Sequence, residues 1–291
     1  MTSLVPSEII LPDRYNYFAV FLTLSCNFKC PYCINRLYDL KVGRRILSGK
    51  EWIQAINKVK TRPDLPLTLQ GGEPTLHPDF YEIIDGIRPD TPIDLLTNLE
   101  FDIDRFMSRI PPERMKREAP YASIRVSYHP GQSNLEEIFS KVLRMLEKGY
   151  HIGVWAVMHP DYIDHIQTAM EKGKSLGIDF RSKEFLGRHQ GKIHGLLKWK
   201  DSSTGNVTRK HVLCRTTELL IDPEGLQFRC HSDLYAGKTP VGNFFSPKWQ
   251  LEDIFRSCTC YGTCNVCDVK VKTDRFQQFG HTSVEIKFEE D

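Results

Sequence analysis

Hydrophobic and polar residues in the first two thirds of the chain form two alternating patterns. Helical spacing of apolar residues is clearest over residues 135–148, where Ile138, Val142 and Leu146 share one face. Short runs rich in β-branched and aromatic residues lie between such stretches, at 17–25, 67–70, 93–96, 123–128, 152–158 and 179–186. Because these predicted strands alternate with predicted helices, the pattern indicates an α/β fold with a parallel sheet and crossover helices.

Residues that could bind a metal or a ligand lie where several of these predicted strands end. A cysteine loop begins at Cys26, Gly71 and Gly72 follow the second strand, Asn98 follows the third, and Ser127 lies near the end of the fourth. Ligands of parallel α/β sheets bind beyond the carboxyl ends of the strands. The sequence therefore predicts one functional site at this edge of the sheet.

The loop after the first strand carries Cys26, Cys30 and Cys33, with the spacing C-x3-C-x2-C. A short loop of this kind can turn three thiolates toward one point, and cysteine thiolates are the usual ligands of iron–sulfur clusters. Three ligands leave one iron of a cubane cluster able to bind and activate a second molecule. A zinc site is the alternative, but the nearest candidates for a fourth ligand, His77 and Cys214, lie far away in the sequence.

Nine cysteines are many for a chain of 291 residues, and they divide into two groups. Three lie in the loop described above and six lie between Cys214 and Cys267. The odd number and the ligand-like spacing favour two metal or cluster sites over a disulfide framework. Such thiolates persist in a reducing compartment, so we expect a cytoplasmic protein.

Charge and hydropathy argue against two classes of partner. The net charge of +2 provides no strong electrostatic case for nucleic-acid binding. No apolar run reaches the roughly 18 residues that a membrane span requires. Residues 1–12 also lack the basic start and the cleavage site of a secretory signal.

The cysteine loop, with Tyr32 directly before its last cysteine, resembles the cluster loop of radical S-adenosylmethionine (radical SAM) enzymes. The resemblance implies an open, partial (β/α)6 TIM-like barrel, and a [4Fe–4S] cluster on Cys26, Cys30 and Cys33 whose open iron binds S-adenosylmethionine (SAM). In that family one electron cleaves SAM to methionine and a 5′-deoxyadenosyl radical, which abstracts a hydrogen atom from the substrate. The protein supplies position and electronic tuning.

The resemblance also implies a set of residues that contact SAM. The Gly-Gly-Glu-Pro segment at residues 71–74 would receive the amino group of its methionine part, because glycine permits close approach and a carboxylate attracts an ammonium. Adenine, ribose and carboxylate contacts would come from the loop and from strand ends. The complete predicted set is Tyr32, Gly71, Gly72, Glu73, Asn98, Ser127 and Arg181. Glu100, His129 and His159 are candidate substrate contacts, and no residue is identified as the general base.

The C-terminal cysteines accompany a predicted β-hairpin, with strands at 216–221 and 226–228 and an Asp-Pro-Glu-Gly turn between them. This hairpin would bring Cys214 and Cys230 together. The spacing C-x10-G-x4-C with a later C-x2-C resembles the auxiliary-cluster domains called SPASM and, in the shorter form, twitch. The resemblance implies one auxiliary [4Fe–4S] cluster on Cys214, Cys230, Cys264 and Cys267, with Cys258 or Cys260 as alternates. Zinc binding by the four late cysteines is the other interpretation.

These observations predict three segments. Residues 1–187 form the partial barrel, residues 188–211 connect, and residues 212–291 form a small α+β auxiliary-cluster domain of the twitch or SPASM type. The connecting segment is polar, and its histidines, His189 and His194, are expected to be solvated rather than to act as ligands.

Three functions are compatible with the sequence. The first is an oxidoreductase-type radical SAM enzyme that acts on a small polar substrate, such as a sugar, aminocyclitol or nucleoside, with the auxiliary cluster taking or relaying an electron. The second is a maturase that forms a crosslink, a thioether or an epimerised residue in a ribosomally made peptide. The third is a non-catalytic zinc-binding protein. Either enzyme would need a low-potential electron donor of the flavodoxin or ferredoxin type.

Overall fold

The computed structural model describes most of the chain. The described residues are 8–33, 46–117, 119, 121–185, 187–194, 210–238, 240–246, 248–251, 253–261 and 284–288. Cys264 and Cys267 lie outside these residues, and Cys260 is described in its backbone alone.

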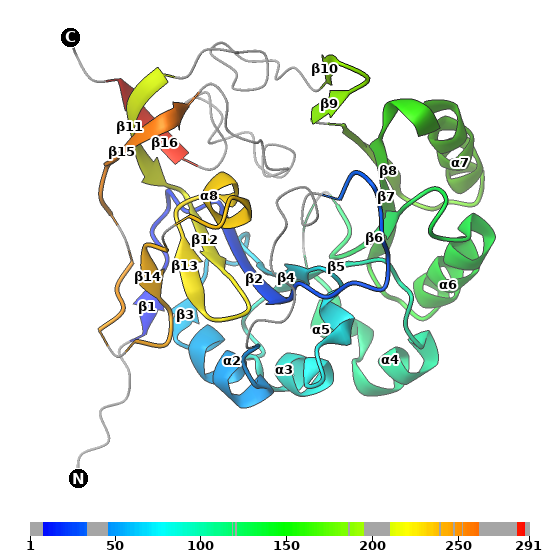
Figure 1. The fold of residues 1–291 in the computed structure, drawn as a ribbon. Coiled ribbons are helices and arrows are strands. Elements are labelled where there is room, and N and C mark those ends of the chain that lie inside the picture. The colour runs from blue at the N-terminus through cyan, green and yellow to red at the C-terminus, as the bar shows by residue number, and fades with distance from the viewer. Residues whose placement is uncertain are drawn as a thin grey trace.

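A nine-stranded sheet forms the centre of the molecule, in the order β14-β13-β12-β2-β4-β5-β6-β7-β8 (Figure 1). Six consecutive strands of this order are parallel and confirm the strands expected from the sequence. They are β2 (Tyr17–Thr23), β4 (Leu67–Gly71), β5 (Ile93–Thr97), β6 (Ile124–Tyr128), β7 (Ile152–Met158) and β8 (Phe180–Glu184). The predicted α/β partial barrel with crossover helices is therefore correct.

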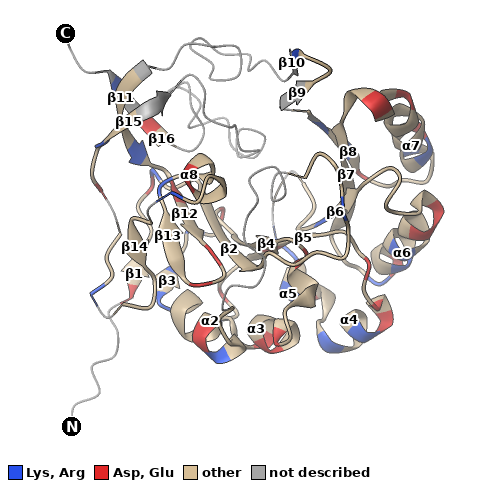
Figure 2. Ribbon diagram, viewed as in Figure 1, with Lys and Arg blue, Asp and Glu red and all other residues tan. Residues whose placement is uncertain are grey.

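Helices cover the outer face of this curved sheet (Figure 1). They are α2 (Gly49–Ile56), α3 (Phe80–Gly86), α4 (Ile103–Arg109), α5 (Pro112–Met115), α6 (Leu135–Glu147) and α7 (Ile163–Ser175). Ser48 and Glu51 form a capping box at the start of α2, and Asn134 caps α6, so unpaired N–H groups at these helix ends are satisfied. Lys and Arg alternate with Asp and Glu along the outer helices (Figure 2).

Strand β2 is buried on both faces, which explains its continuous run of apolar residues. Phe18, Val20 and Leu22 pack into the large core between the sheet and the outer helices. Tyr17 and Phe21 point to the opposite face, where they join a smaller apolar cluster that also contains Ala19, Leu220, Phe228 and Leu234. The C-terminal part of the chain therefore covers the inner face of the first barrel strand.

The predicted C-terminal hairpin exists and belongs to the large sheet. Strand β12 (Glu218–Ile221) pairs in parallel with β2, and β13 (Leu226–Phe228) and β14 (Gly242–Asn243) extend the same edge. A short helix, α8 (His231–Tyr235), follows β13. The sequence indicated the hairpin from its turn, but its pairing with β2 joins segments that are remote in the chain.

A small C-terminal sheet stands next to this edge (Figure 1). It contains β11 (Lys210–Thr216) between the antiparallel strands β15 (Arg256–Tyr261) and β16 (Val284–Phe288). The remaining strands form two short pairs, β1 (Ile9–Ile10) with β3 (Val59–Lys60), and β9 (Gly187–His189) with β10 (Lys192–His194). Among the residues that the structure describes, no helix has the length and apolar character needed to cross a membrane.

Candidate active site

The cysteine loop leaves the carboxyl end of β2, as the sequence predicted. Cys30 is buried, Cys33 is half-buried and Cys26 is exposed, and all three are free thiols. The backbone N–H of Cys33 donates to the carbonyl of Cys30 at 3.1 Å, and the N–H of Phe28 donates to the sulfur of Cys26 at 3.3 Å. The loop is thus a compact turn that presents three thiols within eight residues of chain.

Hydrogen bonds hold this loop across the ends of neighbouring strands. The side-chain amide of Asn98, directly after β5, donates to Oδ1 of Asn27 at 2.7 Å. The backbone N–H of Lys29 donates to Oε1 of Gln132, beyond β6, at 3.0 Å. Asn98 is therefore brought to the loop as predicted, whereas Asn27 and Gln132 are residues that the sequence reasoning missed. Their position beside a strand end was the signal that could have identified them.

The two glycines after β4 permit a close contact with the start of the cysteine loop. A Cβ atom on Gly71, whose φ is +147°, would lie 2.0 Å from the carbonyl oxygen of Thr23. A Cβ atom on Gly72 would lie 2.2 Å from the carbonyl oxygen of Ser25. The N–H groups of Gly72 and Glu73 donate to these same two carbonyls at 2.8 Å. Side chains are therefore excluded here by the backbone of the loop itself, a reason that the sequence did not reveal.

Glu73 connects the end of β4 to the end of β5. Its carboxylate is buried and accepts hydrogen bonds from the Thr97 hydroxyl at 2.9 Å and from the Asn98 N–H at 2.7 Å. It also accepts from the hydroxyl and N–H of Thr75, within the 3₁₀ turn η1 (Pro74–Leu76). Burial raises the pKa of Glu73, and these donors oppose the rise. The carboxylate is thus used to position two strand ends and the turn between them.

Aromatic side chains form one wall beside the loop. The ring of Tyr32 stacks on His159, which follows β7, with centroids 5.1 Å apart. The Tyr32 hydroxyl lies 3.2 Å from Nδ1 of His129, which follows β6. Burial lowers the pKa of His129 to about 4 and raises the pKa of Tyr32, so both side chains are neutral near pH 7. The structure therefore joins Tyr32 to two of the three candidate substrate contacts.

The remaining predicted SAM contacts lie at the same level of the sheet. Ser127 is half-buried near the carboxyl end of β6, where the sequence placed it. Ser127 pairs with Trp155 of β7, and Trp155 pairs with Arg181 of β8. The guanidinium of Arg181 lies over the Trp155 ring, and its Nε lies 2.8 Å from Oδ1 of Asp179. A contact between Arg181 and SAM therefore stays a prediction.

Three of the C-terminal cysteines come together beside the large sheet. Cys214 lies on β11, Cys258 on the adjacent β15 and Cys230 at the start of α8, and they share an apolar cluster with Val212 and Val284. A hydrogen bond with Cys258, together with burial, raises the pKa of Cys214. Burial likewise raises the pKa of Cys230. The sequence predicted Cys258 only as an alternate cluster ligand. Its position beside Cys214 on the neighbouring strand depends on the tertiary structure.

The chemistry of the loop fits an iron–sulfur cluster. It supplies three free thiols on one short turn, and cysteine thiolates are the usual ligands of such clusters. A structural zinc site needs a fourth protein ligand, and the group of converging metal-ligating side chains in the described part of the chain contains no cysteine. The residues present therefore suit a cluster with three protein ligands.

A comparison with protein-family models supports this assignment. The model of the radical SAM superfamily matches residues 20–179, which include the cysteine loop and the strands from β4 to β7. The chain belongs to the radical SAM superfamily. Membership implies a [4Fe–4S] cluster and SAM as cofactors and defines the protein as a radical SAM enzyme.

Curated relatives match parts of the chain. It is 22% identical to a GTP 3′,8-cyclase of Nautilia profundicola over 182 residues, which are 60% of this chain and 57% of the relative. It is 37% identical to a PqqA peptide cyclase of Rhodopseudomonas palustris over 78 residues, which are 27% of this chain and 20% of the relative. A GTP 3′,8-cyclase of Psychromonas ingrahamii matches over 22% of its own length, at 32% identity. The matches thus span at most 57% of these relatives.

Solved structures share the fold at low sequence identity. Native anSMEcpe with bound AdoMet superposes with a TM-score of 0.53 and 13% identity, covering 78% of this chain and 77% of that one. Native anSMEcpe with bound AdoMet and the Kp18Cys peptide superposes with a TM-score of 0.51 and 12% identity over the same shares. These likenesses support the partial-barrel architecture.

Replacing Glu73 by glutamine is expected to lower the stability of the protein in the absence of SAM. A glutamine amide would present N–H groups to donors on Thr97 or Asn98, and an unpaired buried donor costs about 1–3 kcal/mol. Thermal unfolding of cluster-loaded protein without SAM measures this effect. Glu82→Gln, on the exposed side of α3, is the matched control. If Glu73→Gln has unchanged stability but binds SAM more weakly, Glu73 binds the cofactor and does not stabilise the fold.

Proposed function

We propose that this protein abstracts a hydrogen atom from a small polar substrate in an oxidoreductase-type reaction. Cys26, Cys30 and Cys33 would hold the cluster, which with bound SAM supplies the 5′-deoxyadenosyl radical. The observation that carries this proposal is the attachment of the cysteine loop to the ends of β4, β5 and β6. This attachment supports the proposal because it holds the three thiols beside the Gly71–Gly72 turn and Asn98, which we propose as SAM contacts.

The residues around the loop would position SAM and exclude water. The amide of Asn98 is oriented by its bond to Asn27, and Ser127 offers a hydroxyl on the neighbouring strand end. Tyr32, packed against His159, would provide an aromatic surface for the adenine. Glu73 keeps the Gly71–Gly72 turn against the loop, so that the backbone of this turn is fixed beside the site.

We also propose a twitch-type auxiliary [4Fe–4S] cluster near β11, β15 and β16, held by Cys214, Cys230 and Cys258. A fourth ligand would come from Cys260, Cys264 or Cys267. Arg229 lies beside these cysteines: its side chain pairs with Asp233 at 2.7 Å, and its charge partly opposes the rise in the pKa of Cys214 that the hydrogen bond with Cys258 and burial cause. The cluster would take or relay the electron that remains on the substrate after hydrogen abstraction.

The names of the relatives support two substrate classes. Likeness to GTP 3′,8-cyclases favours a small polar substrate related to a nucleoside, which is our first proposal. Likeness to a PqqA peptide cyclase favours a ribosomally made peptide, which is the second. A donor of the flavodoxin or ferredoxin type would supply the electron in either case.

Deuterium transfer distinguishes these proposals. Cluster-loaded protein is incubated with SAM, a chemical reductant and perdeuterated sugars, aminocyclitols, nucleosides or peptides, and 5′-deoxyadenosine is analysed by mass spectrometry. We expect deuterium in 5′-deoxyadenosine with a small polar substrate. Transfer from peptides alone would replace the first proposal by the second. Zinc without sulfide in anaerobically purified protein, in place of about eight iron atoms per chain, would contradict both proposals.

A further inference from the structure

We propose that His159, Asp161 and His189 form a binding site for a divalent transition-metal ion, separate from the cysteines. The three side chains come from two regions of the sequence that the fold brings together. His159 directly follows β7, Asp161 lies in the 3₁₀ turn η2 (Pro160–Tyr162), and His189 ends β9. The expectation that His189 is solvated is wrong, because its side chain is 20% exposed and contacts Asp161.

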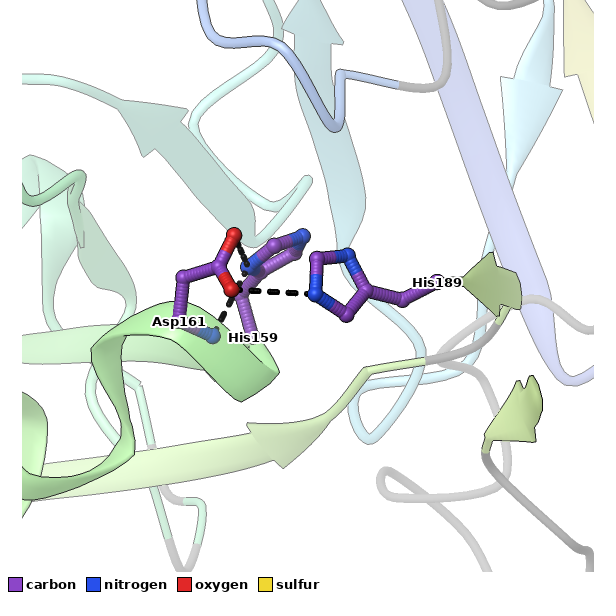
Figure 3. A group of neighbouring side chains, drawn as sticks. All are labelled: His159, Asp161 and His189. Carbon is purple, nitrogen blue, oxygen red and sulfur yellow. Dashed lines mark hydrogen bonds and ion pairs between the residues drawn. The ribbon is translucent and has the colours of Figure 1, made fainter. Parts of the chain in front are cut away.

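The ligand atoms already converge. Figure 3 shows the carboxylate of Asp161 turned toward both imidazole rings. Its Oδ1 lies 2.9 Å from Nε2 of His189, its Oδ2 lies 3.7 Å from Nδ1 of His159, and all three ligand atoms lie within 4.8 Å of one another. Ligands bound at about 2.1 Å to one tetrahedral ion are about 3.4 Å apart. Small side-chain movements would therefore let all three ligand atoms bind one ion.

Two imidazoles and one carboxylate form a donor set that suits zinc, iron or manganese. The backbone N–H of Asp161 also faces Nδ1 of His159, at 3.3 Å, which is longer than an ordinary N–H hydrogen bond. An ion would replace this weak contact and the contact between His189 and Asp161 with three coordinate bonds. Packing restrains both rings, because the His159 and His189 centroids are 4.7 Å apart and Phe185 contacts each of them.

The position of the group suggests what the ion would do. His159 is 7% exposed and stacks on Tyr32 of the cysteine loop, so the ion would lie at the same edge of the sheet as the proposed SAM site. Three protein ligands leave a coordination position open, as in catalytic zinc sites. Resting on the proposed function, we infer that this position receives a hydroxyl or carboxylate oxygen of the substrate. A metal-bound oxygen donor would orient the substrate for hydrogen abstraction.

Zinc binding without substrate tests the site independently of catalysis. Protein with its clusters loaded is titrated with Zn²⁺ by calorimetry, and bound zinc is measured by elemental analysis. We expect one zinc per chain in the wild type, and a loss of affinity of roughly tenfold or more in His189→Ala and Asp161→Asn. Asp161→Asn keeps the shape of the side chain, so a loss of zinc affinity in this variant is due to the missing negative charge. His151→Gln, at the other end of β7, is the control and should bind like the wild type.

X-ray absorption at the zinc edge identifies the ligands. We expect nitrogen and oxygen neighbours and no sulfur. Three results would each overturn the metal site. They are sulfur neighbours around the zinc, no zinc bound to the wild type, and equal zinc affinity in the wild type, Asp161→Asn and His189→Ala. Reductive SAM cleavage without substrate is measured in the same variants. Absence of cleavage in the wild-type protein would contradict the proposed function, whereas absence of zinc binding in wild-type protein that cleaves SAM would contradict the metal site alone.

Discussion

Replacing Cys26, Cys30 and Cys33 together by alanine is expected to abolish reductive cleavage of SAM. The variant should also lose about four iron and four sulfide atoms per chain, because cysteine thiolates are the ligands that hold such a cluster. The fold should persist, since Cys26 is exposed and the loop is additionally held by Asn98 and Gln132. Iron and sulfide analysis, with quantification of 5′-deoxyadenosine after dithionite reduction, measures both effects.

A matched variant distinguishes the role of the loop cysteines in SAM cleavage from that of the C-terminal cysteines. If these residues hold the proposed auxiliary cluster, Cys214→Ala/Cys230→Ala should also lower the iron content. It should retain cleavage, because its cysteines lie on β11 and at the start of α8. Cleavage that survives in the triple alanine variant of the loop would show that the loop does not hold the SAM-binding cluster. Loss of cleavage in both variants, with normal unfolding temperatures, would contradict the separation of the two sites.

Replacing Cys214, Cys230 and Cys258 by alanine is expected to leave SAM cleavage intact and to reduce conversion of the substrate to background. Removal of the proposed auxiliary cluster would leave the electron of the substrate radical without an acceptor. Hydrogen abstraction itself would continue, so deuterium should still reach 5′-deoxyadenosine. Product yield per 5′-deoxyadenosine, measured by mass spectrometry, therefore falls in the variant and stays constant in the wild type.

The stability of this variant also needs a measurement, because Cys214 and Cys230 are buried with Val212 and Val284. Removing a buried sulfur leaves a small cavity, and small core deletions cost roughly 1 kcal/mol each. Cys258→Ala alone is the milder variant, since this side chain is half-buried. It should lose part of the auxiliary iron signal with little change in thermal unfolding. Full product yield from a variant without auxiliary iron would exclude an electron-transfer role for the proposed auxiliary cluster.

Local patterns were sufficient to predict the barrel strands. Strands buried on both faces carry unbroken apolar runs, and the helices between them repeat apolar residues at helical spacing. The connection of β12 to β2 could not be predicted in the same way. A hairpin is encoded by its turn, whereas parallel pairing with a strand about two hundred residues earlier depends on which sheet edge is open.

The site was predicted from the rule that ligands bind at the carboxyl ends of parallel strands. That rule correctly predicted that Asn98 lies next to the cysteine loop. It did not predict the ion pair of Arg181 with its sequence neighbour Asp179. It also did not reveal that the Glu73 carboxylate is directed to β5, because the direction of a side chain depends on donors that arrive from another strand.

The sequence by itself determined the family, the alternation of strands and helices, and the loop of Cys26, Cys30 and Cys33. These features are local: spacing, turn chemistry and apolar period are each set within about ten to twenty residues. Tertiary structure alone decided that Cys258 stands beside Cys214, and that His189 meets Asp161. Both contacts join residues that are distant in the chain. Only the packing of the folded chain brings such residues into contact.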